Sequence, residues 1–117
     1  MDDNELKQRT KDFAHMCVKL TFALPKTNLG RHIASQLIRC STSVAANYRA
    51  VCLAQSKDSF IAKVGIVLEE IDESAFWLEF IIDENMMKEE MIFPLLNEAN
   101  ELTSIFYASR KTARLKR

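Results

Sequence analysis

Basic side chains occur at two places where they could contact the phosphate groups of a nucleic acid. Lys26 and Arg31 lie near a predicted loop, and Arg110, Lys111 and Arg114 lie near the C-terminal end. Lysine and arginine neutralise phosphates and release the counterions bound to them, so clustered bases favour binding to a polyanion. The alternative is that the C-terminal bases complement the end of a helix and keep the chain in solution.

Charges of opposite sign are segregated along the chain. Residues 13–57 contain six basic residues and no acidic ones, whereas residues 58–101 contain twelve acidic residues and two lysines. Residues 102–117 contain five basic residues and no acidic ones, so the net charge of zero conceals three blocks of alternating sign. Such a chain can meet a copy of itself acid to base, or present a basic surface to a polyanion.

The remaining reactive side chains do not form a catalytic or metal-binding pattern. Di-metal bundles use Glu-x-x-His pairs, and the nearest match here is a single Asp12-x-x-His15. The acidic cluster at residues 69–73 is typical of a solvated helix face, and the three cysteines lack the spacing of a metal site. We therefore expect no enzyme activity, no cofactor and no metal.

Length and hydropathy indicate one domain, residues 1–117, with a basic tail at about 110–117. No run of ~20 apolar residues is present, so we expect no membrane segment. The N-terminus is acidic and lacks the basic start of a secretory signal, which predicts a cytoplasmic protein.

The apolar spacing is helical almost throughout. It predicts four helices, over about residues 4–24, 29–53 and 57–84, and from about 91 into the basic tail. Asn28 and Ser56 are the predicted N-caps, and Pro94 belongs in a first turn or at a kink. Short connections predict an all-α fold, an antiparallel up-down-up-down four-helix bundle about 35–40 Å long. The expected core residues are Phe13, Met16, Cys17, Leu20, Leu24, Ile33, Leu37, Cys40, Val44, Tyr48, Val51, Phe60, Val64, Leu68, Ile71, Ala75, Leu78, Ile82, Ile92, Leu95, Ala99, Leu102 and Phe106.

The third predicted helix carries a second apolar face outside its core stripe. Trp77 lies on that face, and a large aromatic side chain there indicates a protein interface. Arg39 lies on a second face of the preceding helix, where it could pair with Glu70 or Glu73 of a neighbouring copy. The predicted oligomer interface contains Arg39, Ser43, Ile66, Glu70, Glu73, Trp77 and Ile81. The alternatives are that Trp77 packs within its own subunit and that Arg39 is solvated.

Three segments carry a family resemblance: residues 36–48 (QLIRCSTSVAANY), 56–63 (SKDSFIAK) and 69–78 (EEIDESAFWL). Together they resemble the bacterial four-helix-bundle family encoded by intervening sequences of 23S rRNA genes, which has been labelled a ribosomal-protein family. A related branch is the accessory variability determinant of diversity-generating retroelements. The resemblance implies a homopentameric ring without known enzyme activity. For the retroelement branch it implies contact with nucleic acid and a reverse transcriptase.

Charge pattern and resemblance together favour a non-catalytic, ring-forming protein that binds RNA or DNA through basic surfaces. The alternative is a protein-interaction scaffold, for example a partner of a reverse transcriptase, that does not contact nucleic acid directly.

Overall fold

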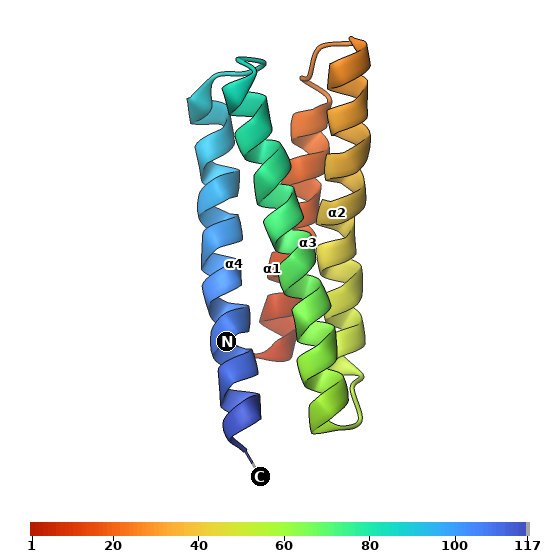
Figure 1. Ribbon diagram of the computed structural model, residues 1–117, viewed down its shortest axis with the longest axis vertical. Coiled ribbons are helices and arrows are strands. Elements are labelled where there is room, and N and C mark those ends of the chain that lie inside the picture. Colours follow the sequence, from red (N-terminus) through yellow and green to blue (C-terminus); the bar gives the residue numbers. More distant parts are fainter. Residues whose placement is uncertain (117) are drawn as a thin grey trace.

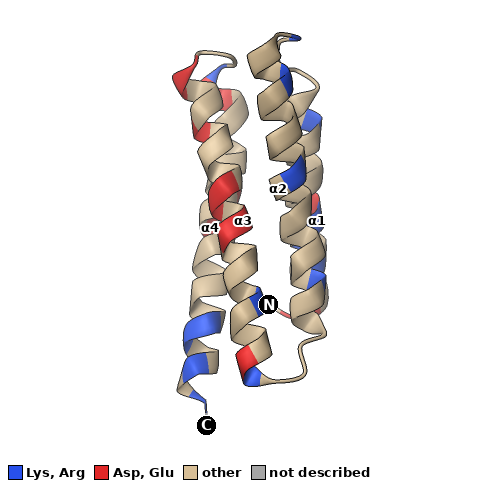
Figure 2. Cartoon of the chain, turned by 45° about the vertical axis from the view of Figure 1, so that its right-hand side comes forward, with Lys and Arg blue, Asp and Glu red and all other residues tan. Residues whose placement is uncertain are grey.

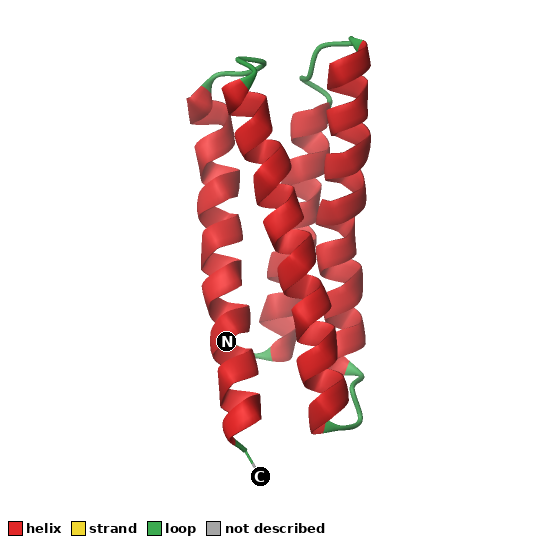
Figure 3. Ribbon diagram, viewed as in Figure 1, coloured by secondary structure: helices red, strands yellow, loops and turns green. Residues whose placement is uncertain are grey.

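Four α-helices joined by short loops make up the computed structural model, which describes residues 1–116 (Figures 1 and 3). The helices are α1 (Asp3–Thr21), α2 (Asn28–Cys52), α3 (Lys57–Asp83) and α4 (Glu89–Leu115). They run alternately up and down, so the N-terminus, the α2–α3 loop and the end of α4 lie at one end of the bundle (Figure 1). The all-α four-helix bundle is therefore confirmed. The bundle is longer than expected, at 51 × 20 × 20 Å.

Side-chain caps fix the starts of α2 and α3. Ser56 accepts a hydrogen bond of 3.1 Å from the backbone N–H of Ser59, as predicted. The predicted cap at Asn28 is wrong, because Thr27 has the extended backbone of an N-cap and accepts a 3.0 Å hydrogen bond from the N–H of Gly30. Asn28 is already helical.

Gly30 is required where α2 begins against the preceding loop. A Cβ atom at this position would stand 1.9 Å from the carbonyl oxygen of Pro25. Because that oxygen belongs to the backbone, no side-chain rotation could relieve the clash. The absence of a side chain at Gly30 therefore lets the α1–α2 loop turn tightly onto α2.

Pro94 does not lie in the first turn of α4. The helix begins at Glu89, five residues earlier, so Pro94 lies inside it. Proline has no N–H to donate to the carbonyl of Glu90, four residues before it. Both residues are exposed, so water can bond to that carbonyl.

The core follows the predicted stripes closely in α1, α2 and α4. Met16 is the exception, because its side chain is exposed. The buried residues of these stripes are Phe13, Cys17, Leu20, Leu24, Ile33, Leu37, Cys40, Val44, Tyr48, Val51, Ile92, Leu95, Ala99, Leu102 and Phe106.

The buried stripe of α3 differs from the prediction. It runs Val64, Val67, Ile71, Ser74, Leu78 and Ile81, alternating steps of three and four residues, with Leu68 beside it. Such a stripe averages 3.5 residues per turn and keeps facing its neighbours along a bundle. The prediction that Ile81 lies on the outer face is therefore wrong, because its side chain is 0% exposed. Phe60, Ala75 and Ile82, which we expected in the core, are only half-buried.

Among neighbouring helices, α1 and α4 contact each other least. Arg9 joins them, donating two hydrogen bonds to the carboxylate of Glu98, at 2.8 and 2.7 Å, and one of 2.9 Å to Glu101. The hydrogen bonding to Glu98 raises the pKa of Arg9. This ion pair fixes the register of α4 against α1.

Within residues 1–116, every helix is too short or too polar to cross a bilayer.

Candidate functional site

Three of the predicted nucleic-acid-binding residues come together on the last turns of α4. Arg110, Lys111 and Arg114 line a surface hollow of about 450 Å³ with Tyr107 and Leu115. The hollow lies at the end of the bundle that also holds the N-terminus (Figure 1). Arg117, the last residue of the predicted basic tail, lies outside the described residues.

Arg110 is held in place by an aromatic ring and by a small residue. Its guanidinium carbon lies 5.0 Å from the centroid of the Tyr107 ring, close enough for a cation–π interaction. Its Nη1 atom lies 3.9 Å from where a Cβ on Gly65 of α3 would stand. The side chain is therefore half-buried between α3 and Tyr107, while Lys111 and Arg114 are exposed.

Within residues 1–116, no carboxylate forms a salt bridge with the cations of the α4 hollow. Among the described residues, the basic partners of salt bridges are Arg9, which pairs with α4, and Arg39, which pairs with α3. Arg110, Lys111 and Arg114 take part in none of these pairs. Their charges are therefore available to an external anion.

The α1–α2 loop, which contains Lys26, and the first turn of α2, which contains Arg31, lie at the other end of the bundle, as predicted (Figure 1). Arg31 donates hydrogen bonds to the carbonyl oxygen of Lys26, at 2.7 Å, and to the side chain of Asn28, at 3.0 Å. Much of its hydrogen-bonding capacity therefore supports the α1–α2 loop. The two predicted basic clusters do not form one patch in a single chain.

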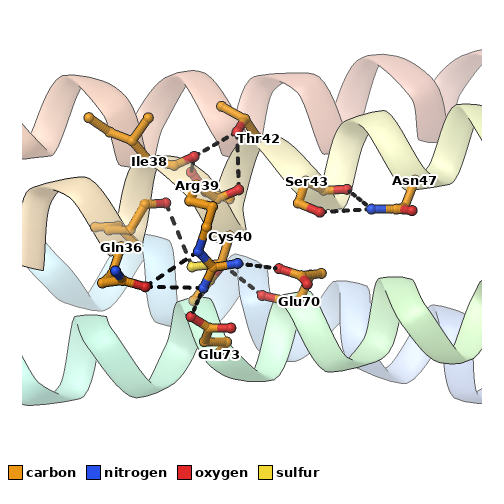
Figure 4. Close-up of polar contacts among 12 residues, drawn as sticks. Gln36, Ile38, Arg39, Cys40, Thr42, Ser43, Asn47, Glu70 and Glu73 are labelled. Atoms are coloured by element: carbon orange, nitrogen blue, oxygen red, sulfur yellow. Dashed lines mark hydrogen bonds and ion pairs between the residues drawn. The ribbon is translucent and has the colours of Figure 1, made fainter.

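Arg39 lies beside Glu70 and Glu73, but the contact is made within one chain (Figure 4). Its Nη1 atom is 3.5 Å from Glu70 Oε2, and its Nη2 atom contacts Glu73. The side chain of Gln36 accepts two further hydrogen bonds of 3.3 Å from Arg39. The expectation that this pair lies between neighbouring copies is corrected, because α2 and α3 of one subunit bring the three charges together.

Burial raises the pKa of Glu70 above its ordinary value. Arg39 opposes this rise, and the neighbouring carboxylates of Glu73 and Glu69 add to it. Beneath the ion pair, Ser74 donates a hydrogen bond of 2.8 Å to the backbone carbonyl of Glu70. The network joins α2 to α3 and explains the burial of a polar residue at Ser74.

Trp77 is half-buried and packs against the core of its own chain. Its ring lies edge to face with His32 of α2, at a centroid distance of 5.7 Å, and with Phe76 at 5.0 Å. Its Nε1–H donates a hydrogen bond of 3.3 Å to Glu73. Trp77 therefore packs partly within its own subunit, which was the alternative to the predicted interface, and part of its side chain remains exposed.

Other members of the predicted interface have mixed surroundings. Ile66 is 42% exposed, and Phe76 of the same helix, which was not predicted as an interface residue, is 50% exposed. Ser43 is half-buried and accepts a hydrogen bond of 2.7 Å from Asn47 on its own helix. The exposed large apolar side chains of α3 are therefore Ile66 and Phe76, which lie nearly three helical turns apart.

Tyr107 was also missed, although the sequence contains a signal for it. Residues 107, 110, 111 and 114 have the spacing i, i+3, i+4 and i+7, which places them on one face of a helix. An aromatic residue among bases at this spacing indicates a surface that can stack a nucleobase and contact its phosphate.

A family model described as 23S rRNA-intervening sequence protein matches residues 2–108 of the chain. The solved structure of a protein of unknown function from the S23 ribosomal protein family of Bacteroides thetaiotaomicron is similar, with a TM-score of 0.83. The two are 30% identical in sequence, and the match covers 90% of this chain and 97% of that chain. None of the curated proteins compared matches the chain.

Proposed function

Because the chain belongs to the family of 23S rRNA-intervening sequence proteins, we propose that it is a non-catalytic, homo-oligomeric bundle that binds nucleic acid. The observation that carries this proposal is the hollow on α4, where Arg110, Lys111 and Arg114 surround Tyr107 without any ion pair among the described residues.

The α4 hollow supplies both interactions that single-stranded nucleic acids use. Its three cations attract phosphates, and the half-exposed ring of Tyr107 offers a face for base stacking. Base–aromatic stacking contributes about 1–3 kcal/mol per base and tolerates any sequence. We therefore expect binding without strong sequence preference.

The test is the affinity for a fluorescently labelled single-stranded RNA across a range of salt concentrations. Each phosphate contact with a single strand contributes a slope of about −0.7 to the plot of log K against log salt. Replacing Arg110, Lys111 and Arg114 with glutamine should therefore reduce the steepness of the slope by about 2. Lys88→Gln, at the opposite end of the bundle, is the control and should change it by less than 1.

No detectable RNA binding by the wild-type protein at ~50 mM salt, where phosphate attraction is strong, would refute nucleic-acid binding. Equal slopes for the α4 triple variant and the control would show that the binding surface lies elsewhere.

Self-assembly is supported by the exposed apolar side chains of Ile66 and Phe76 on the acidic helix α3. The family resemblance implies that the assembly is a pentameric ring. Trp77→Ala should shift the protein toward a folded monomer in sedimentation velocity, with helical content kept. Unfolding of this variant without a folded monomer would assign Trp77 to the core instead.

A second candidate function, a protein-interaction scaffold, is favoured by another surface feature. A hollow of about 920 Å³ with apolar walls opens where α4 continues past the start of α1, and it is lined by Leu6, Phe60 and Ile105 among others. A partner such as a reverse transcriptase could dock there. A defined protein retained after nuclease treatment, together with the absence of RNA binding, would favour this function.

A further inference from the structure

A groove on the outer seam between α1 and α2 gathers basic side chains that the sequence reasoning did not group together. It has a volume of about 420 Å³. Lys7 and Lys11 approach it from successive turns of α1, and Arg49 approaches it from α2. The other lining residues are Asn4, Gln8, Ala45 and Ala46.

The lining side chains of this groove offer donors and no carboxylate. Lysine and arginine donate only, and the amide of Asn4 carries an NH2 group, whereas one N–H of the Gln8 amide already donates to Asp12. Among the described residues, Lys7, Lys11 and Arg49 take part in no salt bridge. A ligand that fills the groove must therefore bring acceptor oxygens and negative charge.

The aspartates close to this end of α1 already have partners within the chain. Asp2 accepts a hydrogen bond of 2.8 Å from the backbone N–H of Glu5, and Asp12 accepts one of 2.8 Å from Gln8. Asp3 accepts a hydrogen bond of 3.3 Å from the hydroxyl of Tyr48. Among the described residues, none of these aspartates forms a salt bridge with Lys7, Lys11 or Arg49, so the three cations can pair with an external anion.

The floor and walls of the groove indicate which part of a nucleic acid it would contact. Ala45 and Ala46 have short side chains, so a phosphate group can approach the helix surface closely. No aromatic ring lines the groove, in contrast to Tyr107 at the α4 hollow. The groove therefore suits the sugar–phosphate backbone rather than the bases.

We propose that the α1–α2 groove is a phosphate-binding site for the backbone of a nucleic acid, formed by Lys7, Lys11 and Arg49. The assignment rests on the proposed nucleic-acid binding and adds a site on a different helix pair from the α4 hollow. Figure 2 shows basic segments on α1 and α2, a second basic group at the end of α4, and acidic segments on α3. The two basic sites are therefore separated and can be tested independently.

The test compares two triple variants with equal loss of charge. Lys7→Gln, Lys11→Gln and Arg49→Gln together remove the groove cations, and Lys19→Gln, Lys63→Gln and Lys88→Gln form the control. Binding of a labelled RNA duplex is measured across salt for both, and circular dichroism checks that both are folded. Three duplex phosphate contacts correspond to a change in slope of about 2.7. We expect that change, and at least a tenfold loss of affinity, for the groove variant alone.

Several outcomes separate this site from the proposed function. If wild-type protein binds and the α4 triple variant is weakened, but the groove variant matches its control, the groove assignment fails alone. If the groove variant is weakened and the α4 variant is not, the groove is supported and the α4 assignment fails. Absence of wild-type binding overturns both.

Inorganic phosphate shares the chemistry of the nucleic-acid backbone, so it forms a second arm of the test. Amide chemical shifts of residues 4–11 and 45–49 are followed by NMR during titration with inorganic phosphate and, separately, with the RNA duplex. Saturation by RNA at a concentration at least a hundredfold lower than by phosphate supports a backbone site. Equal or tighter binding of free phosphate would overturn the nucleic-acid assignment.

Discussion

Replacing Arg39 with alanine should destabilise the bundle, because Arg39 is the cation between two carboxylates of α3. Its Nη1 atom lies 3.5 Å from Glu70 Oε2, and its Nη2 atom contacts Glu73. The side chain of Arg39 is 50% exposed, whereas that of Glu70 is 20% exposed. The ion pair is therefore neither fully exposed nor fully buried.

The magnitude follows from these exposures. An exposed ion pair contributes roughly 0–1 kcal/mol, because water and salt screen it. Removing one partner of a fully buried pair costs about 3–5 kcal/mol, because the other charge is left unpaired. Glu70 Oε2 is buried and accepts no hydrogen bond from the described residues, so it would be left uncompensated. We expect Arg39→Ala to lower the free energy of unfolding by ~1–2 kcal/mol at neutral pH.

This cost should grow as the pH rises. Burial raises the pKa of Glu70, and Arg39 opposes that rise. The folded wild-type protein therefore binds a proton that the unfolded chain has lost, in the window between the ordinary glutamate pKa, about 4.3, and the raised value. In that window the free energy of unfolding falls with increasing pH, and below it the contribution of Glu70 vanishes. Arg39→Ala removes the opposing cation and raises the pKa of Glu70 further. The free energy of unfolding of this variant should therefore fall more steeply with increasing pH than that of the wild-type protein.

Urea unfolding followed by circular dichroism at about pH 4 and at about pH 7 measures this difference directly. Arg49→Ala is the matched control, since Arg49 is an exposed arginine of the same helix that forms no salt bridge with the described residues. In a Glu70→Gln background the cost of Arg39→Ala should shrink. A cost that does not vary with pH, or one equal to that of the control, would refute the reasoning.

Three further predictions concern packing and cysteine reactivity. Ile81→Ala should lower the free energy of unfolding, measured by urea unfolding, by about 2–5 kcal/mol, because the Ile81 side chain is buried. Ile66→Ala on the same helix is the control. In monomeric protein it should change the free energy of unfolding by less than ~0.5 kcal/mol, because Ile66 is exposed. Gly30→Ala should lower the melting temperature despite the better helix propensity of alanine, because its Cβ would collide with the loop backbone; an unchanged or higher melting temperature would contradict this. Burial raises the pKa of Cys17 to about 12, so a thiol reagent at mild alkaline pH should modify half-buried Cys52 first and Cys17 only after unfolding.

Much of the fold could be predicted because apolar spacing along a helix reports which face is covered. The apolar spacing predicted the buried face of α2 correctly, because all six expected residues from Ile33 to Val51 are buried. The apolar spacing was less accurate in α3, which carries large apolar residues on more than one side: Ile81 is buried, whereas Ile66 and Phe76 are exposed. Spacing along one helix does not show which of those sides a neighbour covers. For this reason Ile81 was placed outside the core and Arg39 was paired with another copy.

The two candidate sites also differ in how far they could be predicted from the sequence. The α4 hollow consists of residues on one face of one helix, so its bases could be found from the sequence, and Tyr107 could have been added from the spacing. The α1–α2 groove depends on which turn of α1 lies opposite Arg49. That register results from packing between α1 and α2, and no local pattern in the chain encodes it.

The central claim is that the basic, tyrosine-containing face of α4 contacts nucleic acid, and an NMR footprint tests it most directly. Amide chemical shifts of the wild-type protein are measured with and without a single-stranded RNA at ~50 mM salt, where phosphate attraction is strong. We expect the largest shifts at residues 107–115, with the Tyr107 ring resonances moving upfield as a base stacks on them. Shifts confined to α3, or none on α4 at saturating RNA, would contradict the claim.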